Sequence, residues 1–256
     1  MRETLRYVAI GDSLSEGVGD EPWPDGTLRG WTDRLAALLV ERRGADGMLE
    51  YANLAVRGSK SARVLESQVD EAVAMNPDLV TLTAGMNDLL RPRLDFDVVR
   101  STLIEIVRPF TARGARLLIV PIPDVRAVSP MGRLIDARRL RLNAIYRELA
   151  RDHGVEEIAE TTGSVFEDRR AWAEDRLHLS PLGHERLARA AATSLGVLSD
   201  ADALLPPTGV VPPTTIRAEA LWCWRYVAPW VGRRLRGVSS GDGRIAKRPV
   251  LEPYAK

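Results

Sequence analysis

Residues 116–121 read Arg-Leu-Leu-Ile-Val-Pro, and their four consecutive apolar residues suit a β-strand that is buried on both faces. Such strands belong to parallel sheets whose two faces are covered by helices. Helical patterns lie on both sides of this run, at 97–113, which is closed by Gly114, and at 131–152, which ends before Gly154. The stretch therefore predicts a strand inside a βαβ unit.

The same alternation of strands and helices extends outward from this run. Further strands are predicted at 7–10, 49–56, 79–84 and 155–159, and further helices at 31–43, 61–75 and 181–195. We expect a three-layer α/β/α domain over residues 1–198, with a central parallel, flavodoxin-like five-stranded sheet. Ligands of such domains bind outside the carboxyl ends of the strands, so the chemistry is sought there.

The composition excludes several classes of protein. The chain has 256 residues, of which 45% are hydrophobic and 28% charged, so disorder over the whole length is excluded. Its net charge of +1 predicts no nucleic-acid partner. A single cysteine, Cys223, excludes a disulfide framework and a zinc site built from a cysteine cluster. Because we find no signal-peptide core and no transmembrane run, we expect a cytoplasmic protein.

Three candidate site residues follow the carboxyl ends of three predicted strands. Ser13 lies in Gly-Asp-Ser-Leu at 11–14, Gly58 follows the second strand, and Asn87 lies in Gly-Met-Asn-Asp at 85–88. Each alone has a simpler interpretation, as a helix cap or a turn residue. At one edge of a sheet they would combine a hydroxyl nucleophile, a glycine that lets a ligand approach the backbone, and an amide donor.

One of the three histidines has the spacing of an oriented base. Asp175 precedes His178 by three residues in a predicted loop, and its carboxylate can bond to the imidazole Nδ1–H. That bond leaves Nε2 to take a proton. His153 ends a long predicted helix, and His184 lies inside the last helix of the domain, where we expect a structural role. With the three strand-end residues, the Asp175–His178 pair indicates nucleophilic acyl transfer.

Taken in order, these four blocks resemble those of the SGNH hydrolases of the GDSL esterase/lipase superfamily, over about residues 5–195. The resemblance implies that Ser13 attacks an ester carbonyl, that His178 takes its proton and that Asp175 orients His178. It implies an oxyanion hole made by the backbone N–H groups of Ser13 and Gly58 and the side-chain amide of Asn87. It also implies a small-molecule ester substrate and no metal or organic cofactor.

The second block departs mildly from the family pattern, because residues 53–55 read Asn-Leu-Ala where the family often has Asn-x-Gly. Candidates for substrate binding follow two other strands. Leu89, Leu90 and Arg91 come directly after the Asn87 block, where an acyl pocket and simple packing are equally good interpretations. Met131 follows the fourth strand and is a candidate for another pocket wall.

Three functions fit this set of residues. The first is a serine esterase, the second an acyltransferase in which an alcohol replaces water, and the third a non-catalytic binding module on the same fold. The complete Asp175–His178 pair argues against the third, because a silent module has no need of it. Sugar acetyl esters, lysophospholipids, thioesters and aryl esters all stay open as substrates.

The rest of the chain has a different composition. Residues 199–215 are proline-rich and predict a linker, and residues 216–256 form a basic, Trp-rich C-terminal extension with Trp222, Trp224 and Trp230. We expect these indoles to pack on their own domain or across a homodimer, with peripheral contact to an anionic membrane as the alternative. Residues 237–256 predict an extended or disordered arm. Because the family blocks end before residue 185, we expect removal of residues 205–256 to leave the five site residues in place.

Overall fold

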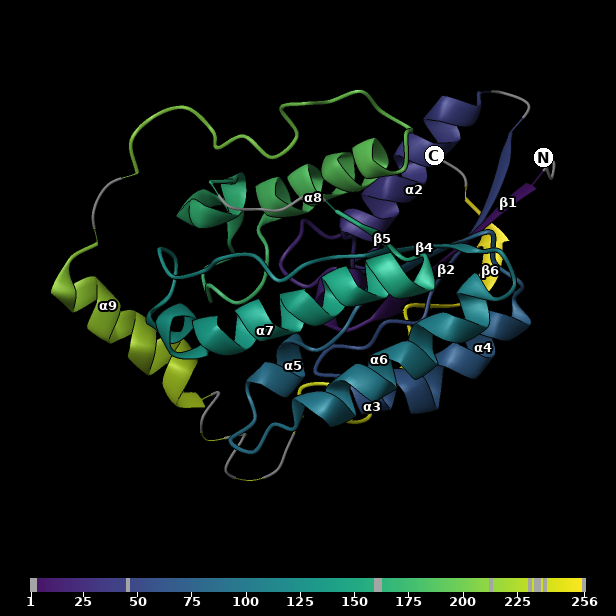
Figure 1. Ribbon diagram of the computed structural model, residues 1–256. Helices are drawn as coiled ribbons and strands as arrows, with labels where there is room; N and C mark the ends of the chain where they lie inside the picture. The colour runs from purple at the N-terminus through teal and green to yellow at the C-terminus, as the bar shows by residue number, and fades with distance from the viewer. Residues whose placement is uncertain are drawn as a thin grey trace.

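A central sheet lies between two layers of helices in the computed structural model (Figure 1). The structure describes residues 4–44, 47–158, 163–211, 214–229, 232, 236 and 239–254. Helices α2 (Trp31–Arg43) and α8 (Pro181–Ser194) cover one face of the sheet. Helices α6 (Phe96–Thr111) and α7 (Pro130–His153) cover the other face, and this is the predicted three-layer α/β/α fold.

Among the described residues, the sheet has six strands in the order β5-β4-β3-β1-β2-β6. Their bounds are β1 Thr4–Gly11, β2 Met48–Asn53, β3 Leu79–Thr83, β4 Arg116–Ile119, β5 Glu156–Glu157 and β6 Arg248–Pro253. The first five are parallel and have the flavodoxin order, as predicted. The sixth strand, which the five-stranded prediction lacks, pairs antiparallel with β2.

The remaining helical segments are shorter. They are α1 Ser13–Glu16, α3 Ser61–Val64, the π-helical η1 Leu65–Val69, α4 Asp70–Ala74, α5 Met86–Leu89, η2 Val165–Glu167, η3 Arg169–Ala171, α9 Ile216–Trp222 and the π-helical η4 Cys223–Val227. The run α3–η1–α4 is the helix predicted at 61–75. The one-turn helices α1 and α5 were not predicted, and they start at the carboxyl ends of β1 and β3.

The central strands are buried on both faces, which explains their continuous apolar runs. In β1, Tyr7 and Ala9 belong to the core beneath α2 and α8. Their neighbours Val8 and Ile10 belong to the core beneath α6 and α7. All four side chains are fully buried. Neighbouring side chains alternate between the two faces of the sheet, and both faces are covered by helices. Polar groups can therefore meet a ligand only at the strand ends.

The C-terminal extension returns to the domain and packs on it. Lys247 Nζ lies 2.6 Å from the buried carboxylate of Asp33 on α2. Tyr254 packs edge-on against Tyr51 of β2, with ring centroids 5.7 Å apart, and its hydroxyl donates to the carbonyl of Asp33. The arm at 237–256 was predicted to be extended or disordered, and strand β6 shows that the disordered alternative is wrong for residues 248–253. The sequence hid the strand because it holds Pro249 and Pro253, which only an edge strand tolerates.

The tryptophans of the extension have different surroundings. Trp222 is 9% exposed and packs on the domain, whereas Trp224 is 77% exposed. Trp230 lies outside the described residues. The predicted linker is without helix or strand over 199–211 and 214–215, the parts of it that the structure describes. In the described parts of the chain, no helix combines the length and apolar character needed to span a membrane.

Candidate active site

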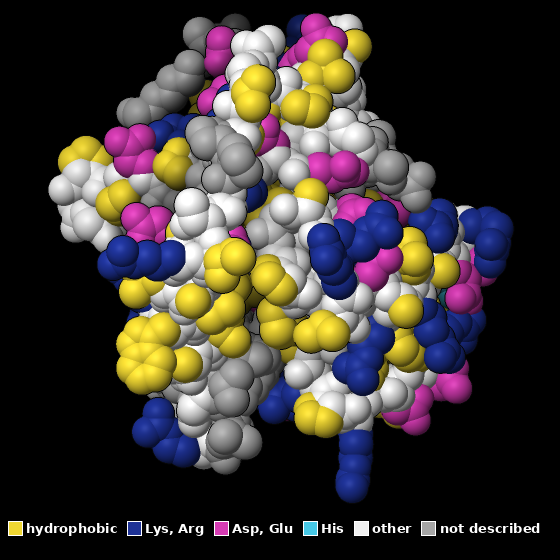
Figure 2. Space-filling model, turned by 90° about the vertical axis from the view of Figure 1, so that its left-hand side faces the viewer, with side chains coloured by type: hydrophobic (Ala, Val, Ile, Leu, Met, Phe, Trp, Pro, Cys, Tyr) yellow, Lys and Arg dark blue, Asp and Glu magenta, His cyan; other side chains and the backbone are white. Residues whose placement is uncertain are grey.

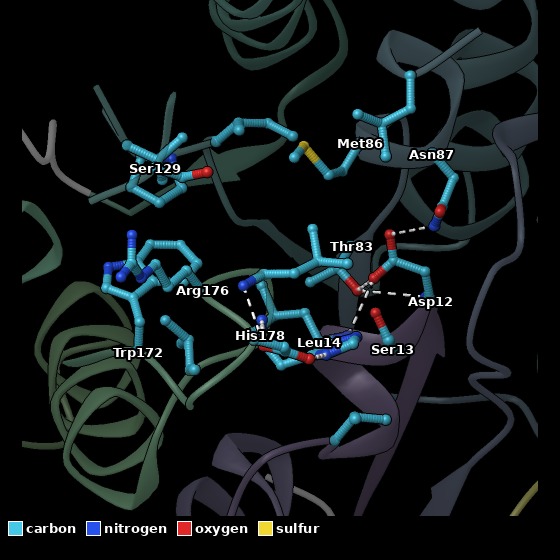
Figure 3. A pocket seen from close by; sticks show the side chains of 18 of the residues that line it. Asp12, Ser13, Leu14, Thr83, Met86, Asn87, Ser129, Trp172, Arg176 and His178 are labelled. Atoms are coloured by element: carbon cyan, nitrogen blue, oxygen red, sulfur yellow. Dashed lines mark hydrogen bonds and ion pairs between the residues drawn. The ribbon is translucent and has the colours of Figure 1, made fainter. Parts of the chain in front are cut away.

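Ser13 is the first residue of α1, directly after the sharp exit from β1. Gly11 has φ of +135°, and a Cβ atom there would lie 2.1 Å from the carbonyl oxygen of Thr83, so only glycine fits. Asp12 caps α1 by accepting a hydrogen bond from the N–H of Leu14 at 3.1 Å. The short helix holds Ser13 on the edge of a cavity. Figure 3 shows Ser13 beside Asp12, with His178 across from them.

The carboxylate of Asp175 holds His178 at two points. Asp175 Oδ2 lies 2.6 Å from His178 Nδ1, and Oδ1 accepts the backbone N–H of His178 at 3.0 Å. Burial alone would raise the pKa of Asp175, but the hydrogen bond and charge of the His178 ring outweigh it, so the pKa is lowered. An ionised carboxylate only accepts, so Nδ1 carries the proton and Nε2 is left as the basic nitrogen.

The loop that carries Gly58 is bonded to the helix that carries Ser13. Glu16 of α1 accepts the backbone N–H of Arg57 at 2.6 Å and forms an ion pair with its guanidinium at 2.8 Å. The Asn53 amide also donates to the Ser15 carbonyl of α1 at 2.7 Å. These bonds fix the Gly58 backbone, which has φ of +76°, relative to α1.

Asn87 is the second residue of α5 and uses its amide inside the protein. Its Nδ2 donates to the Ser59 carbonyl at 3.1 Å and, more weakly, to Asp12 Oδ2 at 3.4 Å (Figure 3). The neighbouring Asp88 accepts the backbone N–H and the hydroxyl of Ser61, at 2.9 and 3.0 Å. The three loops that follow β1, β2 and β3 are thus joined by hydrogen bonds, and the bond from Asn87 to Asp12 is the longest of them.

Asp12 is a buried carboxyl at the centre of these loops. Burial raises its pKa to about 6, although the N–H of Leu14, the Thr83 hydroxyl and the nearby His178 all favour the charged form. Thr83 also accepts from Ser15 or donates to it, at 2.8 Å. Asp12 therefore connects the cap of α1, the end of β3 and the Asn87 amide.

All five predicted site residues, Ser13, Gly58, Asn87, Asp175 and His178, line one cavity of about 290 Å³. Two of the predicted substrate-binding residues, Leu90 and Met131, line it as well. The other two are placed differently. Leu89 is buried in the core beneath α6 and α7, and the Arg91 carbonyl accepts a hydrogen bond from Arg138 of α7.

Most of the other side chains along the cavity are apolar. They include Leu14, Val18, Met86, Val120, Ile122, Ile135, Phe166, Trp172 and Leu179, which come from both faces of the sheet. On the face of the molecule that carries α9, hydrophobic side chains gather on either side of a hollow (Figure 2). Among the described residues, no group of three His, Cys, Asp or Glu side chains could hold a metal ion.

The prediction from sequence missed a further set of cavity residues, which lie in the C-terminal extension: Trp222, Tyr226, Val227, Ser239 and Ser240. The only signal for them is the density of aromatic residues in the extension, which predicted burial but not its place. It also missed Arg176, whose φ of +53° is unusual for a side-chain-bearing residue. Its guanidinium lies over the Trp222 ring at 4.4 Å. The extension therefore contributes part of the cavity lining.

Residues 9–186 match the GDSL-like Lipase/Acylhydrolase family. The curated protein YpmR of Bacillus subtilis (strain 168), which is described as uncharacterized, is 32% identical over 113 residues. That stretch is 43% of this chain and 40% of YpmR, so the match spans less than half of the relative's length. The C-terminal extension lies outside the family match.

Solved structures share the fold. TesA superposes with a TM-score of 0.59 at 22% identity, covering 75% of this chain and 99% of TesA. Axe2, an acetylxylan esterase from Geobacillus stearothermophilus, has a TM-score of 0.59 at 20% identity, covering 77% of this chain and 97% of Axe2. At these identities the likeness shows a common fold.

Proposed function

Since the chain belongs to the GDSL-like lipase/acylhydrolase family, we propose that it is a serine hydrolase that cleaves carboxylic esters through an acyl-enzyme on Ser13. The observation that carries the proposal is the Asp175–His178 pair, joined at 2.6 Å, on the same cavity as Ser13. A hydroxyl, an oriented imidazole and amide donors at one cavity are the groups that acyl transfer requires.

His178 moves the proton in both halves of the reaction. As the Ser13 hydroxyl attacks the ester carbonyl, its proton goes to His178 Nε2 and a tetrahedral oxyanion forms. When the ester C–O bond breaks, the same proton passes to the leaving alcohol. Water then repeats the sequence on the acyl-enzyme, which releases the acid and restores the Ser13 hydroxyl. Asp175 stays ionised throughout and stabilises the imidazolium, in line with its lowered pKa.

Three donors are proposed to hold the oxyanion. They are the backbone N–H groups of Ser13 and Gly58 and the side-chain amide of Asn87, all on the cavity. The N–H of Ser13 is free of the helix's own bonds because it belongs to the first turn of α1. Asn87 turns toward the oxyanion by giving up its 3.4 Å bond to Asp12. One such donor is typically worth about 3 kcal/mol of barrier.

The test of this function compares two neighbouring serines. Ser13→Ala should lower kcat for p-nitrophenyl esters by about 10⁴-fold or more and abolish labelling by a fluorophosphonate. Ser15 is the matched control, because it is fully buried and bonded to Thr83. Ser15→Ala should keep the label, which mass spectrometry should place on Ser13. Hydrolysis that survives in Ser13→Ala, or a label on another residue, would refute the assignment.

A further inference from the structure

We propose that the C-terminal extension is part of the active site, and that it supplies the wall against which an apolar chain of the ester substrate binds. The proposal rests on the proposed function and adds to it the class of substrate. The family match ends at residue 186, so the wall lies outside the matched region. Residues from two separate parts of the extension line the same cavity as Ser13.

One end of the wall is the helical segment α9–η4, which docks on the loop of Asp175 and His178. Trp222 Nε1 donates to the Glu174 carbonyl at 2.9 Å, and the Tyr226 hydroxyl bonds to the Glu174 carboxylate at 2.6 Å. Arg176 forms an ion pair with Glu219 at 2.7 Å. These contacts lie on both sides of Asp175 and place the Trp222 and Tyr226 rings on the cavity.

The other end of the wall lies against the loop of Gly58. A Cβ atom on Gly58 would lie 2.5 Å from Ser239 Oγ and 2.9 Å from Ser240 Oγ. A Cβ atom on Gly241 would lie 2.1 Å from the Arg57 carbonyl oxygen. Two glycines therefore allow the two backbones to approach closely. The extension therefore reaches the cavity beside the loop of Asp175 and His178 on one side and beside the Gly58 loop on the other.

The wall is held in place beyond the site. Strand β6, which begins at Arg248 after the Ser239–Gly241 turn, pairs with β2, and Lys247 binds Asp33 at 2.6 Å. The Lys247 ammonium also donates to the Leu28 carbonyl at 3.2 Å. Because both the helical segment and the strand are fixed on the domain, the cavity between Ser13 and the wall has a defined shape.

The chemistry of the lining indicates what fills that cavity. The polar groups of Ser13, Asn87 and His178 mark the place where the ester bond reacts. The wall contributes the apolar side chains of Trp222 and Val227 to the cavity. The other sides of the cavity contain further apolar residues: Leu90, Met131, Ile135, Phe166 and Trp172. An apolar chain buries its surface there, with a gain of about 0.8 kcal/mol for each methylene.

The test uses two tryptophans of the same helical segment. Trp222→Ala should lower kcat/KM for p-nitrophenyl octanoate about ten-fold or more relative to p-nitrophenyl acetate, mainly through KM. Trp224 is the matched control, because it lies two residues away and is 77% exposed. Trp224→Ala should keep the wild-type rates on both esters. The same comparison with octyl acetate and methyl acetate tests whether the chain that binds the wall belongs to the alcohol part of the ester.

Two further measurements keep the inference separate from the proposed function. Trp222→Phe retains an apolar ring without the bond to Glu174, and it should restore the chain-length preference if the wall acts by contact with the chain. Binding of 1-decanol to the Ser13→Ala protein, followed by calorimetry, needs no catalysis and should be weakened by adding Trp222→Ala but not Trp224→Ala. Equal decanol binding in both double variants, or equal rates on short and long chains in the wild type, would overturn the wall. If the wild type hydrolysed no ester but decanol binding differed between the two double variants as expected, only the proposed function would be overturned.

Discussion

His184 is a histidine that the proposed chemistry does not use, and both of its ring nitrogens are occupied. Nδ1 accepts the backbone N–H of Trp31 at 3.1 Å, and Nε2 donates to the Val18 carbonyl at 3.1 Å. The ring thereby joins α8 to the start of α2 and to the turn after α1. These bonds fit the structural role that its place in a helix predicts. Burial lowers the pKa of His184 to about 4.

The lowered pKa of His184 predicts a loss of stability in acid. The unfolded chain takes up the His184 proton near pH 6.5, whereas the folded protein resists it down to about pH 4. The contribution is thus complete above pH 6.5 and is lost as the pH falls from 6.5 to 4, amounting to about 3 kcal/mol. Urea unfolding of the wild type and of His184→Gln at pH 7 and pH 4.5 measures it.

The comparison with the variant is needed because Asp12 acts in the opposite direction. Its raised pKa of about 6 means that the folded protein binds this proton more readily than the unfolded chain, so this group favours folding as the pH falls. The difference between wild type and His184→Gln isolates the histidine. An equal loss of stability in both proteins would show that His184 is not the group responsible.

A second prediction about a single residue concerns Asp175. Asp175→Asn keeps the shape of the side chain, but its amide can donate to His178 Nδ1 and stabilise the wrong tautomer. We expect kcat to fall about 10⁴-fold, as the equivalent change does in serine proteases, with little change in melting temperature. Asp168→Asn is the control, because Asp168 caps η3 and pairs with Arg170 at 2.6 Å. A nearly normal kcat for Asp175→Asn would remove Asp175 from the mechanism.

At the scale of the element, β6 is attached to α2 by a buried ion pair. The side chains of Lys247 and Asp33 are 11% and 1% exposed. Burial raises the pKa of Asp33, although the charge and hydrogen bond of Lys247 oppose this. The carboxylate therefore depends on its partner, and the pair determines how firmly β6 is held against the domain.

Removal of one partner of this pair should be costly. Lys247→Met leaves the Asp33 charge buried and unpaired, and we expect the free energy of unfolding to fall by about 3–5 kcal/mol. The double variant Lys247→Met/Asp33→Asn removes the charge as well and should recover a large part of that loss. Denaturant unfolding of the wild type and both variants tests the pair. If the single and double variants were equally stable, the pair would contribute no coupling.

The elements that the sequence predicts well are those with a long periodic pattern. Helix α2 covers the predicted residues 31–43, and α7 agrees with 131–152 within one residue at each end. Helices α1 and α5 have four residues each, which is too short for a period to be recognised. They form because the chain must turn sharply at the ends of β1 and β3. Strand β6 is specified by its contact with β2, about 200 residues away, rather than by its own residues.

At the scale of the whole molecule, the extension completes both the sheet and the site. A protein that ends at residue 215 would lack β6 and α9. It would open the hydrogen-bonding edge of β2, expose Tyr51 and leave Asp33 unpaired. We expect a lower melting temperature, a tendency to aggregate and a loss of chain-length preference. Thermal unfolding and light scattering of the truncated chain test this, and an unchanged melting temperature with a monodisperse solution would contradict it.

The candidate site was predictable to the extent that it lies in local motifs. Ser13, Gly58, Asn87, Asp175 and His178 each stand in a short block, and the order of the strands brings the blocks to one edge. Trp222 and Ser239 have no such block. Their place follows from tertiary contacts with Glu174 and Gly58, which no pattern along the chain contains. For the same reason, Leu89 and Leu90 looked alike in sequence, while only Leu90 lines the cavity.

The pairing of β6 with β2 also has a consequence in time. About 200 residues separate the two strands, so at about 5–20 residues per second a ribosome makes β6 some 10–40 s after β2. During that interval a nascent chain carries β2 as an unprotected sheet edge, and the turn beside Gly58 does not yet exist. The final assembly of the sheet and of the pocket therefore waits for the same late segment, and a polypeptide interrupted in translation would have neither.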